Sequence, residues 1–136
     1  MSSLDAFTQD WTTDGLKIKP MFLSFYETVS NMENVAVSYV GRPGISHSLR
    51  AAHSDQKRRP LFVMIDVIDD EPGQRWLSVC FYGDMITDPE ALGDLIPEGL
   101  LGDDGYCFDI SGPDEDLHEY VRQRIHEAYA AAANDK

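Results

Sequence analysis

The chain has 136 residues, of which 43% are hydrophobic and 10% aromatic, and its 24 acidic and 11 basic side chains give a net charge of −13. This hydrophobic content argues against a disordered acidic protein and predicts a single domain with a sizeable core over residues 1–136. The charge argues against general binding to nucleic acid or to an anionic membrane, because long-range repulsion opposes both.

The sequence shows neither an apolar run long enough to cross a bilayer nor a basic start followed by an apolar stretch. We therefore expect no membrane span, no signal peptide and a cytoplasmic protein. Cys80 and Cys107 lie in predicted strands among large apolar residues, where a reduced, buried thiol is the usual state and a disulfide the less common alternative. Two cysteines alone make no metal site, and we expect neither a metal nor a cofactor.

The N-terminal part is predicted to form an arm followed by a helix. In residues 1–18, Phe7 and Trp11 fall on one helical face, so this arm would lay two aromatic rings on the body of the domain. A helix follows Pro20, which suits a first helical position, and apolar residues recur at helical spacing from Phe22. This apolar stripe should face a sheet.

Four strands are predicted in the middle of the chain. Residues 35–40 and 45–50 alternate in polarity and are joined by a tight turn, which is typical of a hairpin. Residues 61–68 form a nearly continuous apolar run broken only by Asp66, so we place them as a central strand covered on both faces. Residues 75–82 alternate and form its neighbour.

The last third is predicted to mix short elements with a final helix. A Thr-Asp-Pro-Glu start predicts a short helix over 87–95, and 98–105 reads as a glycine-rich acidic loop. Residues 106–110 form a fifth strand, and acids within 111–116 begin the terminal helix, where the helix dipole favours them. We expect residues 130–136 to be a frayed tail.

These elements predict an α+β fold: a single domain with an antiparallel meander sheet of four or five strands, helices packed on one face and a C-terminal helix. Their order resembles a family of small bacterial α+β domains of unknown function. The resemblance covers the chain from Phe22 onward and is carried by residues 44–49, 61–68, 76–82, 109–117 and 127–129. It implies the fold alone, since the family has no established catalytic residues.

Charge is distributed unevenly along the chain. Residues 42–59 carry five basic side chains and one acidic one, whereas residues 66–119 carry sixteen acids and one base. Within the first of these segments, arginines, histidines and serines share one hairpin and could present guanidinium groups and hydroxyls to a phosphate or carboxylate. The alternative is that these bases pair with the protein's own acids.

Asp66 is a second candidate, because an acid within an apolar strand needs a partner. Arg50, Arg75 and His47 are the neighbouring choices, although His47 and Arg50 lie on opposite faces of an ideal strand. We therefore name as candidate ligand-binding residues Arg42, His47, Arg50, Arg58, Asp66 and Trp76. No residue is assigned a catalytic or metal-binding role, and the acidic segment does not match a calcium-binding EF-hand loop.

Three functions are open as hypotheses. The first is a noncatalytic binding or protein-interaction module, in which Trp76, Tyr82 and the basic hairpin rim a partly covered sheet face that takes a protein partner or a small anionic ligand. The second is a small enzyme that acts on an anionic small molecule through His47 and Asp66, although no nucleophile elbow accompanies them. The third is self-association as a homodimer through an uncovered sheet face or edge.

Overall fold

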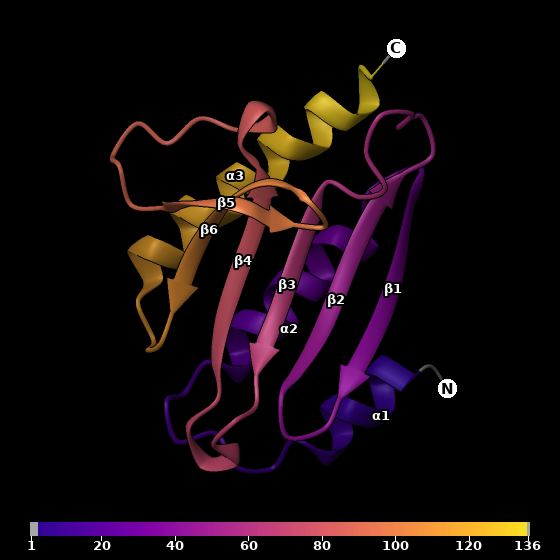
Figure 1. The fold of residues 1–136 in the computed structure, drawn as a ribbon. Helices are drawn as coiled ribbons and strands as arrows, with labels where there is room; N and C mark the ends of the chain where they lie inside the picture. The colour runs from indigo at the N-terminus through magenta and orange to yellow at the C-terminus, as the bar shows by residue number, and fades with distance from the viewer. Residues whose placement is uncertain (1–2, 136) are drawn as a thin grey trace.

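The computed structural model describes residues 3–135 as a six-stranded antiparallel sheet with three α-helices (Figure 1), which confirms the predicted α+β class. Two short 3₁₀ turns, η1 and η2, flank β4. The elements are α1 (Ser3–Asp10), α2 (Lys19–Ser30), β1 (Val35–Arg42), β2 (Ser46–His53), β3 (Val63–Ile68), η1 (Pro72–Gln74), β4 (Trp76–Tyr82), η2 (Gly83–Met85), β5 (Asp94–Leu100), β6 (Asp103–Ile110) and α3 (Glu115–Ala133).

The strands follow the order β1-β2-β3-β4-β6-β5, and all neighbours are antiparallel. The first four form the predicted meander. After β4 the chain passes over the position next to it, forms β5 at the edge, and returns as β6 between β4 and β5. The sheet therefore has one strand more than the four or five predicted.

The additional strand, β5, replaces the end of the helix that we predicted over 87–95, and that prediction was wrong. The carboxylate of Asp88 accepts hydrogen bonds from the backbone N–H groups of Leu92 and Gly93, which closes a turn. Ala91 within this turn has a φ of 54°, which a right-handed helix does not allow. The hydrogen bonds that the Asp88 side chain accepts from nearby backbone N–H groups thus stabilise a turn in place of the predicted helix.

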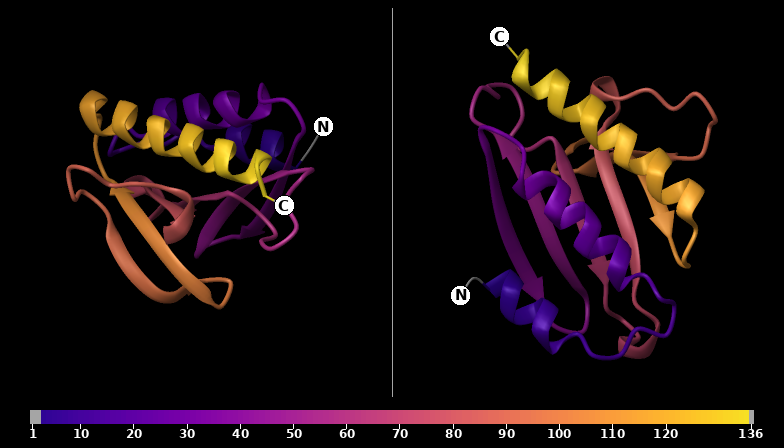
Figure 2. Two further views of the ribbon diagram at one scale, coloured as in Figure 1. Left: turned by 90° about the horizontal axis from the view of Figure 1, so that it is seen from above. Right: turned by 180° about the vertical axis from the view of Figure 1, so that it is seen from behind.

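The helices cover one face of the sheet, as both views in Figure 2 show. Alternate side chains of β3 and β4 point into this layer, where Ile65 and Val79 are fully buried. Phe7 and Trp11 of the N-terminal arm are buried against the same core, as predicted. Helix α3 continues through Ala133 with Ala132 in the core, beyond the point where we expected fraying.

The opposite face of the sheet is covered only in part. The β5–β6 hairpin bends across one end of it (Figure 1) and encloses a small second core of Leu61, Met64, Cys80, Tyr82, Leu100 and Cys107. Strand β3, which we predicted to be covered on both faces, is therefore covered on both faces only at that end. The remaining side chains on this side of β1–β4 form what we call the open face: Ala36, Ser38, Val40, Arg42, Ser46, Ser48, Arg50, Ala52, Asp66, Ile68, Trp76 and Ser78.

The two cysteines form a disulfide, so the expectation of reduced thiols was wrong. Cys80 in β4 lies directly opposite Cys107 in β6, with their Cα atoms 4.1 Å apart. This pairing depends on β6 rather than β5 lying next to β4, which spacing along the chain does not reveal. Structural disulfides are rare in the cytosol, so this bond weighs against the cytoplasmic location that we expected.

Candidate functional site

Strand register places Asp66 near the centre of the open face. It lies opposite Ser48 of β2 on one side and Ser78 of β4 on the other, and Val40 of β1 follows Ser48 in the same row. Directly opposed residues in an antiparallel pair point to the same face. The open face therefore holds a central row of small polar groups with one carboxylate among them.

The carboxyl group of Asp66 is incompletely satisfied. Its Oδ1 atom is buried and has no hydrogen-bond partner within residues 3–135. Burial raises the pKa of Asp66, while the Ser48 hydroxyl and the charges of Arg50 and Arg42 offset this rise only in part. Of the three partners predicted for Asp66, Arg50 alone lies beside it on this face.

Arg42 and Arg50 flank the central row from opposite sides. Arg42 belongs to the row of Ser46 and Trp76, two residues further along one strand direction, and Arg50 lies two residues along the other. Arg50 lies on the strand next to Asp66 and Arg42 lies one strand further away, and the charges of both act on the carboxyl group of Asp66. Arg50 donates through Nε to the Ser48 hydroxyl at 3.2 Å, and Arg42 is exposed.

These two arginines differ from the others in the part of the chain that the structure describes. The other five each lie within 4.0 Å of a carboxylate: Arg58 of Asp135, Arg59 of Asp84 and Asp103, Arg75 of Asp69, Arg122 of Glu119, and Arg124 of Glu127. Within residues 3–135 neither Arg42 nor Arg50 forms such an ion pair. The alternative that the bases neutralise the protein's own acids therefore holds for five arginines and fails for these two.

His47 lies on the other face of the sheet, so the structure separates it from the predicted site. It is 6% exposed, its Nδ1 atom lies 2.7 Å from the Tyr39 hydroxyl, and its Nε2 atom lies 2.8 Å from Oδ2 of Asp69. A neutral imidazole that donates to Asp69 and accepts from Tyr39 uses both nitrogens. His47 and Asp66 therefore lie on opposite faces of the sheet, and the structure does not bring together the pair that the enzyme hypothesis uses.

Asp69 joins this histidine to an arginine. Arg75 donates through Nε to Oδ1 of Asp69 at 2.6 Å. Burial opposes ionisation of Asp69, but the hydrogen bonds from Arg75 and His47 outweigh it, so its pKa is lowered. One alternative from the sequence was that the basic hairpin pairs with the protein's own acids, and His47 does pair with Asp69 in this way.

Arg58 also lies apart from the open face. It donates through Nε to Asp135 at 2.9 Å, and the same carboxylate accepts the backbone N–H groups of Lys57 and Arg58. These bonds lower the pKa of Asp135 to about 2. Arg58 thus fastens the loop before β3 to the end of α3, and the open face keeps four of the six predicted residues: Arg42, Arg50, Asp66 and Trp76.

Comparisons of the chain with protein-family models, with curated proteins and with solved structures found no match. The resemblance to small bacterial domains of unknown function therefore stays a prediction. Within residues 3–135, no group of three or more histidine, cysteine, aspartate or glutamate side chains is arranged to hold a metal ion, and no helix is long and apolar enough to cross a bilayer.

Proposed function

We propose that the protein is a noncatalytic binding module whose open face takes a small anionic ligand with carboxylate or phosphate groups. The observation that carries this proposal is the absence of any ion pair to Arg42 and Arg50 within residues 3–135, although the chain has 24 acidic side chains. Guanidinium groups that share one surface and have no carboxylate within 4.0 Å suit bidentate, charge-assisted bonds to an anion.

The position of the arginines defines where the anion would lie. Arg42 and Arg50 flank the row of Val40 and Ser48 from its two sides, so a ligand with two anionic groups can engage one arginine with each. The Ser48 hydroxyl adds a hydrogen bond at the centre. Asp66 works against a negative ligand. Burial raises the pKa of Asp66, so we expect this opposition to weaken as the pH falls.

Half-buried apolar side chains border the same surface. Trp76 and Ile68 lie opposite each other in the row that Arg42 begins, and Val40 lies in the central row. An indole ring offers a flat apolar surface for an aromatic or aliphatic body. The preferred ligand is therefore an anion with an apolar portion, such as a nucleotide or a substituted dicarboxylate, rather than a bare ion.

The test is an NMR titration of isotopically labelled protein with phosphate, nucleotides and small dicarboxylates at low salt. We expect saturable shifts confined to β1, β2 and their neighbours, and an affinity about tenfold lower in Arg50→Gln or Arg42→Gln, since each removes a charge-assisted pair. Arg58→Gln is the matched control, because Arg58 pairs with Asp135. Diffuse unsaturable shifts, or equal weakening by Arg58→Gln, would reject the anion site.

The other functional expectations stay predictions. The contacts within residues 3–135 do not bear on a protein partner at the open face or on a homodimer. The cytoplasmic location also stays a prediction, and the Cys80–Cys107 disulfide favours an oxidising compartment instead. Binding measurements should therefore be made on the oxidised protein.

A further inference from the structure

The β5–β6 hairpin concentrates exposed apolar side chains. Six large hydrophobic residues are exposed within residues 3–135, and four of them lie between positions 92 and 101: Leu92, Leu95, Ile96 and Leu101. Single exposed leucines are ordinary, but clusters of them mark interaction surfaces. None of these four residues belongs to the open face, so a binding role for the hairpin does not rest on the proposed anion site.

The turn at the tip of the hairpin contains an unfavourable residue. Leu100 pairs with Asp103, so Leu101 and Gly102 form a two-residue loop, and their φ values are 53° and 93°. Such loops with positive φ at both positions strongly prefer Asn-Gly or Gly-Gly, because a leucine side chain is strained there. Leu101 is nevertheless 54% exposed, so packing within its own chain does not explain its presence. A residue that breaks a local rule in this way points to a function.

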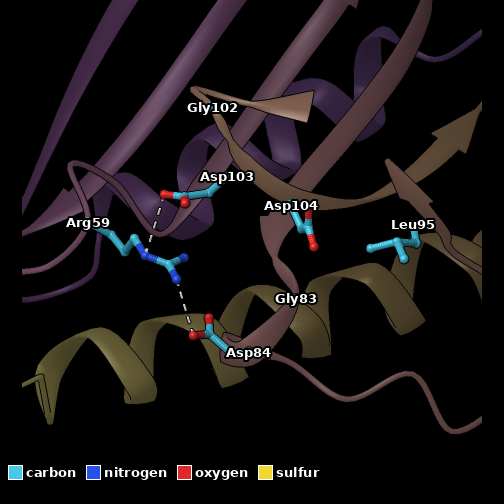
Figure 3. A pocket seen from close by; sticks show the side chains of 7 residues that line it. All are labelled: Arg59, Gly83, Asp84, Leu95, Gly102, Asp103 and Asp104. Carbon is cyan, nitrogen blue, oxygen red and sulfur yellow. Dashed lines mark hydrogen bonds and ion pairs between the residues drawn. The ribbon is translucent and has the colours of Figure 1, made fainter. Parts of the chain in front are cut away.

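The charges around the hairpin select the chemistry of an occupant. Residues 76–121 contain no lysine or arginine. A hollow of about 420 Å³ next to the tip is lined by Asp84, Asp103 and Asp104, with Arg59 as its basic residue, and Figure 3 shows Arg59 held between the first two. Leu95 borders the same hollow beside Asp104. Apolar contact and surplus negative charge thus meet at one place.

We propose that the β5–β6 hairpin docks a segment of a partner protein that combines apolar side chains with lysine or arginine. Its apolar side chains would pack on Leu95, which lines the hollow, and on Leu101 at the tip, and a basic side chain would enter the hollow beside Asp104. Ile96 follows Leu95 in β5 and therefore points to the other side of the hairpin. Anionic partners are repelled by the same carboxylates, and so is the equally acidic hairpin of a second copy. Pro97 has no N–H group, so the contact is made through side chains more than by addition of a strand to β5.

The test is fluorescence anisotropy of a labelled short peptide of alternating lysine and leucine, added to the oxidised full-length protein. Leu101→Asn removes the apolar side chain while favouring the left-handed turn, so it should weaken binding about tenfold without lowering the melting temperature. Leu95→Ser should weaken binding similarly. Ile45→Ser is the matched control, because Ile45 is 61% exposed and lies between β1 and β2; it should leave the affinity within about twofold.

A charge pair of variants separates specific docking from general attraction to an acidic protein. Asp104→Asn should weaken peptide binding about fivefold, whereas Asp70→Asn, which makes the same charge change in the turn after β3, should have little effect. Equal effects of the two variants, or full binding by Leu101→Asn, would overturn the proposal. Self-association in sedimentation runs at two concentrations that is lost in Leu101→Asn would also overturn it, because the occupant would then be a second copy.

Discussion

The ring of Phe7 stacks on the imidazole of His47, with their centroids 3.8 Å apart and their planes 13° from parallel. This contact joins α1 to β2, two elements separated by α2 and β1 in the sequence. The guanidinium group of Arg75 also lies 5.5 Å from the same Phe7 ring. A buried polar network thus provides the surface on which the N-terminal arm packs.

Phe7→Ala should reduce the free energy of unfolding by about 3–4 kcal/mol, because it removes a buried ring and leaves a cavity against His47 and Trp11. Urea unfolding followed by circular dichroism measures this change. Ile45→Ala is the control and should cost less than about 0.5 kcal/mol, since Ile45 is exposed. An equally small effect of Phe7→Ala would mean that the arm does not stabilise the domain.

Asp69 should make stability depend on pH in the acidic range. Its pKa is lowered in the folded state, so its contribution is fully present above the unfolded value of about 3.9 and is lost as the pH falls through the folded pKa. Asp69→Asn should cost about 2–4 kcal/mol at neutral pH and flatten this acid-side loss. Urea unfolding at a series of pH values tests both effects. Asp70→Asn, at the next and exposed position, should reproduce neither.

Asp66→Asn should stabilise the protein at neutral pH. The pKa of Asp66 is raised by burial, so the folded state disfavours the charged form and its stability falls as the pH rises above the unfolded pKa. A neutral amide removes this penalty and also the repulsion of a bound anion, so the affinity measured by NMR should rise. Lower stability of Asp66→Asn would instead identify the carboxylate as a supporting partner of Arg50.

Reduction of the Cys80–Cys107 disulfide should lower the free energy of unfolding by about 3–4 kcal/mol, as chain-entropy arguments give for a loop of this length. The bond spans 27 residues. Urea unfolding with and without a phosphine reductant measures the difference, and the double variant Cys80→Ser with Cys107→Ser should show no response to the reductant. A wild-type protein that titrates two free thiols after air oxidation would contradict the observed bond.

The sequence was sufficient to predict most of the elements, because alternation and helical spacing report which side chains are buried. It failed at β5, where Thr-Asp-Pro-Glu favours a helix start although Asp88 closes a turn instead. Within β5, Asp94–Ile96 are all exposed and Pro97 interrupts the pattern, so the usual strand signal is missing. Pairing with β6 decides its conformation, and this pairing is a tertiary interaction.

The candidate site could be predicted only in part. Alternation along one strand correctly indicated that His47 and Arg50 lie on opposite faces, which the register of β1, β2 and β3 confirms. The pairing of Arg58 with Asp135, 77 residues away, depends on where α3 ends against the loop before β3. Which arginines remain without a carboxylate partner is therefore a property of the whole fold, and composition cannot supply it.

The bond between Cys80 and Cys107 closes a ring of chain that contains β5 and the turn at Asp88, and it ties β4 to β6 whether or not β5 is in place. Strand β5 can therefore separate from β6 by a local opening that leaves the remaining five strands paired. Hydrogen exchange at the amides of β5 should report this local opening, whereas exchange in β3 and β4 should require global unfolding. We therefore expect the edge of the sheet and its centre to behave as two cooperative units within one domain.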